Sequence, residues 1–303
     1  MAIQHVGILS IGEMGYHWAR LLGSHGVDVL TYAKGRSEVT RKRAENAGVR
    51  LVPSWLRLVE ESDLIVSLLN PSSAERVASK VARTLVRVEK KNLLYLDANA
   101  ISPMTAKAID QALSPTHTSF IDGCIIGSAI KLAQGAVLYI SGPQAEQMTA
   151  LEQFGFSIKV LGPQIGQASA FKIVYAGLTK GLQGLLVELL VGARKFGLLD
   201  EILQRYDESF PGLVDKVGRS IASLPVHAGR RAEEMSELSR MFRHHGLTAV
   251  MAPAVRKILQ SIAALNVGRA SEIGVREGTL RGTVELLFER GLLNEKKRLL
   301  RRR

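Results

Sequence analysis

Residues 6–22, VGILSIGEMGYHWARLL, have the pattern of a strand, a glycine-containing turn and a helix. An apolar, β-branched run leads into a turn that contains Gly12 and Gly15, and a helical pattern follows. In a strand–turn–helix unit that binds a dinucleotide, one glycine lets the pyrophosphate approach bare backbone, and a later one lets the helix pack on the strand. Gly12 and Gly15 suit these roles, while Ser10 takes the place of the usual first glycine. The predicted cofactor contacts of this turn are Ser10, Ile11, Gly12, Glu13 and Met14.

The first half of the chain alternates between short apolar runs and helical patterns. Strands are expected at residues 5–11, 27–33, 49–52, 63–69, 93–97, 119–126, 136–141 and 157–161. Helices are expected at residues 13–24, 38–47, 54–61, 73–86, 103–113 and 145–154. This spacing predicts βαβ units and a mostly parallel sheet that is buried on both faces. The fold class is therefore α/β, with an N-terminal domain of the Rossmann type.

After Gly162-Pro163 the strand pattern ends. Residues 166–197 form one long apolar pattern that predicts a buried helix between two domains. Further helices are expected at residues 211–223, 228–244, 248–263 and 279–290. We therefore expect a dinucleotide-binding domain at residues 1–163. An all-α domain for substrate binding and dimerisation, with a basic C-terminal tail, is expected at residues 164–303.

The composition is that of a globular protein, with 303 residues, 46% hydrophobic and 22% charged. No run of about 18 apolar residues occurs, so we expect no membrane-spanning helix. The single cysteine, Cys124, excludes an internal disulfide and favours a reducing, cytoplasmic location. Adjacent His244 and His245 have no partner at zinc-ligand spacing, so no metal is expected.

The formal net charge is +12, and residues 296–303 carry six positive charges, which leaves 12 − 6 = +6 for residues 1–295. No aromatic residues interleave with the charges of this tail, so a nucleic-acid partner is not expected. A mildly basic body suits a small anionic substrate and the phosphates of a cofactor.

The loop after the second expected strand indicates which cofactor binds. A carboxylate at this place would hold a ribose 2′-hydroxyl, but no acid occurs before Glu38. Lys34, Arg36 and Ser37 stand there instead, and a guanidinium with a hydroxyl suits a 2′-phosphate. The sequence therefore favours NADP(H). The alternative is a solvated basic loop in which Ser37 is the N-cap of the next helix.

Five stretches, in order, are similar to motifs of one superfamily, the 6-phosphogluconate and β-hydroxyacid dehydrogenases. The matching stretches are LSIGEMG (9–15), LLNPSSA (68–74), LDANAISP (96–103), IDGCIIGS (121–128) and GQASAFKIVYAGLTKG (166–181). The chain resembles this superfamily over nearly its whole length. It is most similar to the branch whose C-terminal domain is like that of phosphogluconate dehydrogenase but has no assigned function.

The resemblance implies roles for residues outside the glycine turn. It places Leu69, Asn70 and Asn99 against the cofactor, with Asn99 also in a catalytic position, where the superfamily has a serine–threonine pair near the nicotinamide. It places Gly127 and Ser128 where a Ser-Gly-Gly run normally binds a substrate carboxylate. The motifs that bind the cofactor thus match the superfamily, while the motif that binds the substrate carboxylate differs from it.

Lys172 matches the catalytic lysine of the superfamily's interdomain helix, and Tyr175 stands where an asparagine usually follows. The residues themselves also favour Lys172 as a general acid and base, because it lies in the most apolar helix near a domain boundary. Burial beside a cationic nicotinamide would lower its pKa toward neutrality. Tyr175 is a candidate hydrogen-bond donor, and Lys180 is a weaker candidate for proton transfer. The alternative for Lys172 is a side chain that extends to water from a buried helix.

Three functions follow as hypotheses. The first is an NADP(H)-dependent dehydrogenase or reductase that acts on a hydroxyl or carbonyl carbon of a small anionic molecule. The second is an imine reductase, which resembles this architecture but typically has an aspartate or tyrosine at the place of Lys172. The third is a catalytically idle NADP(H)-binding protein. The apolar helical domain and the resemblance together predict a homodimer.

Overall fold

The computed structural model describes residues 3–88, 90, 92–267 and 279–293. The chain forms two compact units, Met1–Lys172 and Ile173–Arg303, and the division falls inside the helix α6 (Gln167–Lys195). The domain boundary near residue 163 stays a prediction. The basic tail, residues 296–303, lies outside the described residues.

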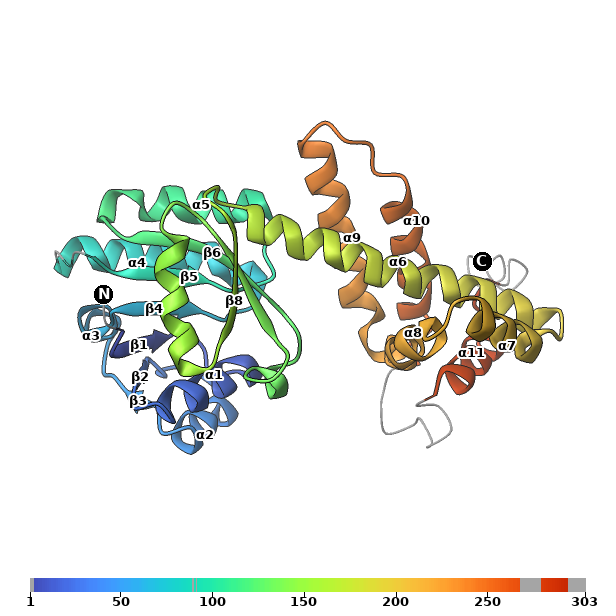
Figure 1. Ribbon diagram of the computed structural model, residues 1–303, viewed down its shortest axis with the longest axis horizontal. Coiled ribbons are helices and arrows are strands. Elements are labelled where there is room, and N and C mark those ends of the chain that lie inside the picture. Colours follow the sequence, from blue (N-terminus) through green and yellow to red (C-terminus); the bar gives the residue numbers. More distant parts are fainter. Residues whose placement is uncertain (1–2, 89, 91, 268–278, 294–303) are drawn as a thin grey trace. The chain divides into compact units, whose positions relative to one another are not determined.

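One sheet forms the centre of the first unit, and its strands follow the order β3-β2-β1-β4-β5-β6-β7-β8 (Figure 1). Neighbouring strands are parallel except β6 and β7, which are antiparallel. The strands are β1 (His5–Ile8), β2 (Asp28–Thr31), β3 (Arg50–Leu51), β4 (Leu64–Ser67), β5 (Leu94–Asp97), β6 (Ser119–Ile126), β7 (Val137–Ser141) and β8 (Ser157–Gly162). The α/β prediction with a mostly parallel sheet is confirmed. The strand order reverses between β1 and β4, and ligands of such sheets bind at the carboxyl ends beside that reversal.

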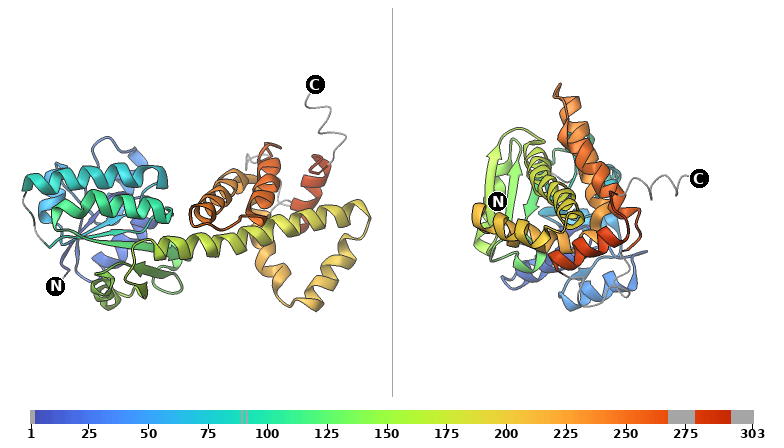
Figure 2. Two further views of the ribbon diagram at one scale, coloured as in Figure 1. Left: turned by 90° about the horizontal axis from the view of Figure 1, so that it is seen from above. Right: turned by 90° about the vertical axis from the view of Figure 1, so that its right-hand side faces the viewer.

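Helices cover both faces of the sheet. The helices α3 (Trp55–Glu61), α4 (Ala74–Val88) and α5 (Pro103–Leu113) pack on one face, where α4 and α5 lie side by side (Figure 2). The helices α1 (Glu13–Gly23) and α2 (Glu38–Asn46) pack on the other face with the 3₁₀ helix η4 (Ala145–Phe154). The expected helix at residues 145–154 is thus present, but with the tighter 3₁₀ geometry. Short 3₁₀ turns occur at η1 (Pro71–Ser73), η2 (Ser114–Thr116) and η3 (Ala129–Lys131).

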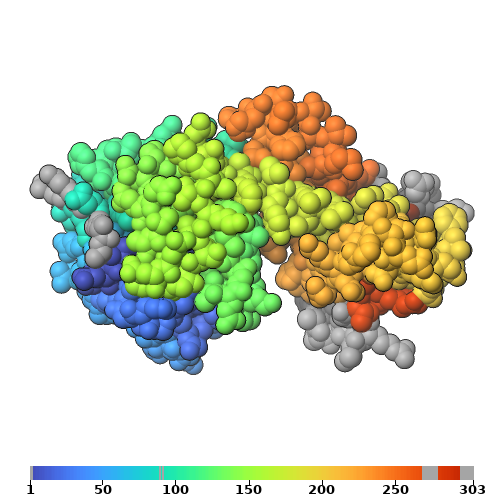
Figure 3. Space-filling view, viewed as in Figure 1, coloured from blue at the N-terminus to red at the C-terminus, as the bar shows by residue number. Residues whose placement is uncertain are grey.

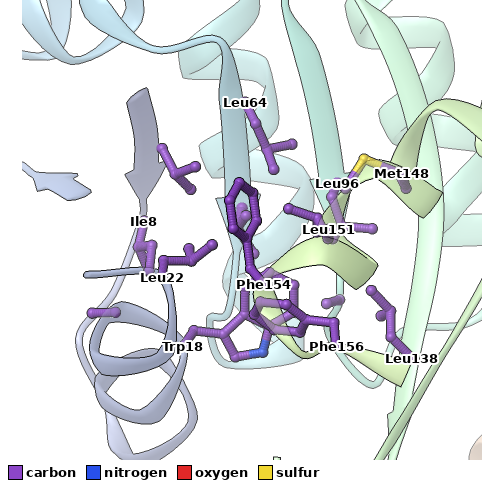
Figure 4. Close-up of a cluster of buried hydrophobic side chains, with 14 of the residues drawn as sticks. Ile8, Trp18, Leu22, Leu64, Leu96, Leu138, Met148, Leu151, Phe154 and Phe156 are labelled. Atoms are coloured by element: carbon purple, nitrogen blue, oxygen red, sulfur yellow. The ribbon is translucent and has the colours of Figure 1, made fainter. Parts of the chain in front are cut away.

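Aromatic side chains fill the core between α1, η4 and the sheet (Figure 4). The rings of Trp18 and Phe156 lie 4.4 Å apart between centroids, and Phe154 lies in the same cluster. Burying side chains of this size contributes about 1.5–3 kcal/mol each. The cluster therefore fixes α1, and with it the preceding turn, on the sheet. The segment from η4 to β8 reaches the surface of this unit, as suits a strand at the sheet edge (Figure 3).

The second unit is helical in its described residues. After α6 come α7 (Leu199–Ser209), α8 (Leu213–Ala222), α9 (Leu224–His244), α10 (Met251–Ala263) and α11 (Leu280–Glu289). The helices α9 and α10 pack along each other (Figure 1). The helix α7 was not expected, because its charged sequence LDEILQRYDES has few apolar positions.

By length and composition, α6 would be able to cross a membrane, with a mean hydropathy of 1.3 over its most apolar stretch. A single helix of this kind is weak grounds for a membrane span, because the core helix of a globular protein has the same composition. One third of that stretch is buried.

Candidate cofactor and active site

The turn after β1 has the form of a phosphate site. Gly12 is the N-cap of α1, no side chain caps this helix, and a Cβ on Gly12 would meet nothing within 4 Å. A Cβ on Gly15 would collide with the backbone oxygen of Ser10. The chain therefore needs glycine at position 15 for close packing, and it leaves open space above the helix N-terminus at Gly12. Backbone N–H groups and the helix dipole favour an anion at such a place.

The other predicted residues of the turn lie around this space. Ile11 is fully buried and anchors the turn in the core, and Met14 packs partly against the same core. Ser10 is half-buried, and Glu13 is exposed in the first turn of α1. The backbone of Ser10 and Gly12 can thus face a ligand while Ile11 holds the turn on the sheet.

The loop after β2 brings cations to this turn. Arg36 donates from Nη2 to the carbonyl oxygen of Leu9 at 3.2 Å, so its guanidinium lies beside the β1–α1 turn. Arg41 donates from Nε and Nη2 to the carbonyl oxygen of Arg36, at 3.3 and 3.2 Å. Lys34 is exposed nearby in the same loop. The nearest following acid, Glu38, pairs with Lys42 at 2.8 Å.

Ser37 has the capping role that the alternative interpretation predicted. Its Oγ accepts a hydrogen bond from the backbone N–H of Thr40 at 3.3 Å, and Ser37 is the N-cap of α2. Its hydroxyl also lies 3.0 Å from the Thr40 hydroxyl. Ser37 therefore starts α2 and places that helix N-terminus next to the cations.

Asn99 joins the ends of β4 and β5. Its Oδ1 accepts from the backbone N–H of Leu69, and its Nδ2 donates to Ser67 Oγ at 2.8 Å and to Asp97 Oδ2 at 2.9 Å. Asn99 is 4% exposed, and every polar atom of its amide has a partner within the protein. The structure thus gives Asn99 a bracing role that shapes the Leu69–Asn70 loop, and the catalytic contact expected from the sequence stays a prediction. Asn70 is exposed at the end of that loop.

Asp97 and Asp122, which the sequence analysis did not assign to the site, are buried beside it. Burial raises the pKa of Asp97 to about 6, against the lowering effect of the hydrogen bonds from Asn99 and Ser67. Asp122 accepts hydrogen bonds from the backbone N–H groups of Gly166 and Ser169, at 3.1 and 3.0 Å. Burial also raises the pKa of Asp122. An acid inside an apolar strand sequence, as in LLYLDA and SFIDGC, was the signal available for both.

Gly127 and Ser128 follow the end of β6. Gly127 has φ +134°, and a Cβ there would lie 2.6 Å from Cα of Ala136, so only glycine fits this bend. Ser128 is exposed and is the N-cap residue of η3, but its side chain makes no capping bond. Both predicted substrate residues therefore lie at the strand end with Ser128 open to solvent.

Lys172 lies against the same strand. Its Nζ donates to the carbonyl oxygen of Ile125 at 3.2 Å, near the carboxyl end of β6. Cys124 is buried close by, and its pKa is raised to about 12 by burial. Lys172 is half-buried rather than extended fully into water. It thus lies on the sheet edge that also carries the Gly12 turn and Asn99.

Two further candidates belong to the second unit. Tyr175 is 47% exposed. Lys180 pairs with Glu234 at 2.8 Å, and Arg230 pairs with the same acid at 2.6 Å. Lys180 is therefore part of an ion-pair network.

The residues present fit a dinucleotide. The space above Gly12 and the helix N-terminus suit a pyrophosphate, and the Arg36 loop beside them suits the adenosine end. Among the described residues, no group of three or more histidines, cysteines and acids could hold a metal ion.

This fold, with its glycine turn and helix N-terminus at the carboxyl edge of the sheet, is that of dinucleotide-binding proteins of the Rossmann type. The family model for the NAD binding domain of 6-phosphogluconate dehydrogenase matches residues 5–158, about half of the chain. A second model, a domain of unknown function (DUF1932), matches residues 193–262. The chain belongs to the 6-phosphogluconate dehydrogenase-like family of hydroxyacid dehydrogenases, as the resemblance predicted.

Two curated relatives match different lengths of this chain. An uncharacterized 28.5 kDa protein of Methanothermus fervidus is 30% identical over 85% of this chain and 98% of its own length. The mitochondrial 3-hydroxyisobutyrate dehydrogenase of Bos taurus is 25% identical over 55% of this chain. The match spans half the length of that enzyme.

Solved structures share the fold over most of the chain. A conserved protein of unknown function, described as similar to 3-hydroxyacid dehydrogenases, has a TM-score of 0.73 at 29% identity and covers 86% of this chain and 97% of its own. Mycobacterium tuberculosis 3-hydroxyisobutyrate dehydrogenase has a TM-score of 0.71 at 16% identity, over 94% and 99%. An imine reductase of Streptomyces aurantiacus has a TM-score of 0.57 at 13% identity, over the same shares.

Proposed function

We propose that the protein is an NADP(H)-dependent oxidoreductase that moves hydride between the nicotinamide and a hydroxyl or carbonyl carbon of a small anionic substrate. The observation that carries this proposal is the position of Lys172, whose Nζ donates to the carbonyl oxygen of Ile125 at 3.2 Å. The Gly12 turn lies at the same carboxyl edge of the sheet. A proton-transfer group and a phosphate-binding turn thus share the edge at which such sheets bind ligands.

The chemistry assigned to Lys172 is proton transfer. The bound cofactor supplies the hydride acceptor or donor. In the oxidation, the C–H electron pair leaves the carbinol carbon as hydride, the hydroxyl proton passes to the neutral Nζ of Lys172, and a C=O bond forms. In the reduction, the Lys172 ammonium returns that proton to the oxygen. A positioned acid–base group typically contributes about 10²–10⁴-fold in rate.

The preference for NADP(H) rests on the loop after β2. A hydrogen bond from the Arg36 guanidinium to the carbonyl oxygen of Leu9 holds Arg36 beside the turn. The Arg41 guanidinium donates to the backbone carbonyl oxygen of Arg36. Guanidinium groups bind phosphate through parallel N–H bonds, whereas a ribose hydroxyl is best bound by a carboxylate. The first acid that follows in the sequence, Glu38, is paired with Lys42. The charge of the loop therefore supports a 2′-phosphate.

The substrate class rests on Ser128 and on the relatives. Ser128 is exposed at the end of β6, the strand whose Ile125 carbonyl accepts from Lys172. Several curated relatives are named 3-hydroxyisobutyrate dehydrogenase, so a small hydroxy acid or its oxo acid is the first substrate class to test.

An imine reductase is the second candidate function. It is favoured by the exposed Tyr175, one helical turn after Lys172, which suits a proton donor to nitrogen. The same fold occurs in the imine reductase of Streptomyces aurantiacus. In this case a C=N bond accepts the hydride on carbon and a proton on nitrogen.

The test compares two lysine variants of one helix. NADPH absorbance is followed with a panel of 3-oxo acids, aldehydes and cyclic imines, and with NADP⁺ and 3-hydroxy acids in the reverse direction. Lys172→Met is expected to keep NADPH binding but lose at least about 10²-fold in kcat. Lys180→Met, the matched control, loses the ion pair with Glu234 and keeps kcat within about twofold, because Lys180 is held in that ion-pair network and not on β6.

The outcomes separate the candidate functions. Turnover of oxo or hydroxy acids that depends on Lys172 supports the proposal. Near-normal turnover of cyclic imines by Lys172→Met contradicts the lysine mechanism and favours the imine reductase, with Tyr175 as the next residue to change. NADPH binding without turnover of any substrate in the panel favours an idle binding protein.

A further inference from the structure

Four buried polar side chains lie at one level of the sheet, at the carboxyl ends of β4 and β5, within β6 and at the end of β7. The register pairs Ser67 of β4 with Asp97 of β5, Asp97 with Asp122 of β6, and Asp122 with Ser141 of β7. Residues paired in register point to the same face of a sheet. All four residues are fully buried, at 0% exposed. We call Ser67, Asp97, Asp122 and Ser141 the polar row.

Burying two carboxylates on adjacent strands is unfavourable. Each pKa is raised by burial, and the charge of Asp122 further raises the pKa of Asp97. A buried charge is tolerated where hydrogen bonds compensate it, and acids with a strongly perturbed pKa occur at functional sites as well as in structural networks. The partners of the two acids therefore indicate what the row does.

The partners of Asp97 lie on the cofactor side. Asp97 Oδ1 accepts from the backbone N–H of Asn99 at 3.0 Å, and Oδ2 accepts from Asn99 Nδ2 at 2.9 Å. These two bonds fix the Asn99 amide, whose oxygen accepts from the N–H of Leu69. The Asp97 carboxylate thus fixes the position of the Leu69–Asn70 loop through Asn99, without contacting the loop itself.

The partners of Asp122 lie on the lysine side. Besides the N–H groups of Gly166 and Ser169, Asp122 accepts from the hydroxyl of Ser169 at 2.6 Å and from the hydroxyl of Ser141 at 3.2 Å. Ser141 also accepts from the N–H of Ala168 at 3.0 Å. The acid therefore holds the first turn of α6, where a negative charge also interacts favourably with the helix dipole.

Lys172 follows Ser169 by three residues, so both side chains leave the same side of α6. Ser169 reaches Asp122, and Lys172 reaches the Ile125 carbonyl, and both acceptors belong to β6. Two contacts to one strand fix the rotation of the helix about its axis. The lysine is thereby aimed at the end of β6.

We propose that the polar row positions the two halves of the site separately: Asp97 sets the cofactor loop through Asn99, and Asp122 sets Lys172 through the first turn of α6. This inference rests on the proposed function, in which the loop binds NADP(H) and the lysine transfers a proton. Neither acid touches the reacting groups. Both are positioning residues.

Two isosteric variants, Asp97→Asn and Asp122→Asn, test the separation. The first readout is the Kd of NADPH, measured by fluorescence. The second is the rate at which acetic anhydride labels the Lys172 amine, measured by mass spectrometry at fixed pH and normalised to Lys180. Asp110→Asn, another partly buried acid of this unit, is the matched control and changes neither readout.

Asp97→Asn is expected to weaken NADPH binding at least tenfold while Lys172 labelling stays within twofold. Asp122→Asn is expected to raise Lys172 labelling at least fivefold while the Kd of NADPH stays within twofold. If both variants move both readouts together, or move neither, the proposal is overturned. If an asparagine variant does not fold, Ser67→Ala and Ser169→Ala each remove one bond of a row carboxylate and are expected to show the same separation at smaller size.

Failure of the proposed function gives a different pattern. If Lys172→Met retains turnover, the lysine mechanism fails, yet labelling still reports whether Asp122 positions the amine. If the unmodified protein does not bind NADPH, the cofactor assignment and the proposed role of Asp97 are both wrong. The role of Asp122 is then decided by labelling alone.

Discussion

The two units of the molecule differ in how far their large apolar side chains are buried. In the first unit, large apolar residues such as Trp18, Phe154 and Phe156 lie in cores on both faces of the sheet. In the second unit, α6 leaves Val174, Leu178, Leu185 and Leu189 exposed by 52%, 66%, 46% and 43%. The first unit thus completes its own core, whereas the second presents an apolar surface. A unit of the second kind is typical of a chain that pairs with another copy.

The largest expected effect concerns this exposed helix face. Its residues follow each other at intervals of four, seven and four, so they line one side of α6. We expect a homodimer through the helical region, and Leu178→Glu with Leu185→Glu is expected to weaken it by at least about 100-fold, because two unpaired charges would be buried. Sedimentation velocity of the unmodified protein and the double variant measures this. A monomer of the unmodified protein at micromolar concentration would contradict the prediction.

The second prediction compares two glycines of the first unit. Gly15→Ala is expected to lower the free energy of unfolding by about 1–3 kcal/mol, because its Cβ would meet the Ser10 backbone. Gly12→Ala has room for its methyl group and is expected to change stability by less than about 0.5 kcal/mol, yet to weaken NADPH binding. Chemical denaturation and NADPH titration of both variants separate the two roles. Equal loss of stability in both would refute the assignment.

The third prediction concerns pH and Asp97. The pKa of Asp97 is about 6 in the folded chain, above the 3.8 of an ordinary aspartate, so between these values the native state holds a proton that the unfolded chain has lost. This contribution to stability is fully present below about pH 4 and is lost as pH rises through about 6. The loss is about 2–3 kcal/mol, at 1.36 kcal/mol per pH unit.

Urea unfolding of the unmodified protein and of Asp97→Asn at several pH values measures this loss. The difference between the two measures the titration of Asp97 together with its coupling to Asp122, whose charge raises the pKa of Asp97. If the difference in the free energy of unfolding between the two proteins stays constant from about pH 4 to about pH 6.5, the pKa of Asp97 is not raised by folding, and the prediction is wrong.

The sequence predicted the elements better than the contacts. The range of α5 was predicted correctly because Ser102 caps it and Pro103 begins it, and both signals are local. The helix α7 was missed because its residues are mostly charged and exposed. Local patterns define an element where its cap and apolar face are both present in the sequence.

The site was predicted in part. The places of Gly12, Gly15 and Lys172 follow from motifs, and the structure puts all three where the sheet ends. The bracing role of Asn99 and the burial of Asp97 and Asp122 depend on the register between strands far apart in sequence. Sequence spacing does not determine which buried acid meets which amide, so these contacts required the fold.

We expect the carboxyl edge of the first unit to bind NADP(H) through the turn at Gly12 and the loop at Arg36. Calorimetric titration with NADPH and NADH, for the unmodified protein and for Arg36→Ala, measures this binding. We expect NADPH to bind more tightly, and Arg36→Ala to weaken NADPH by about tenfold or more while leaving NADH nearly unchanged, as for the loss of a charge-assisted contact of about 1.5–3 kcal/mol. Equal affinities for both cofactors in the unmodified protein, or an equal loss of both in the variant, would contradict the account.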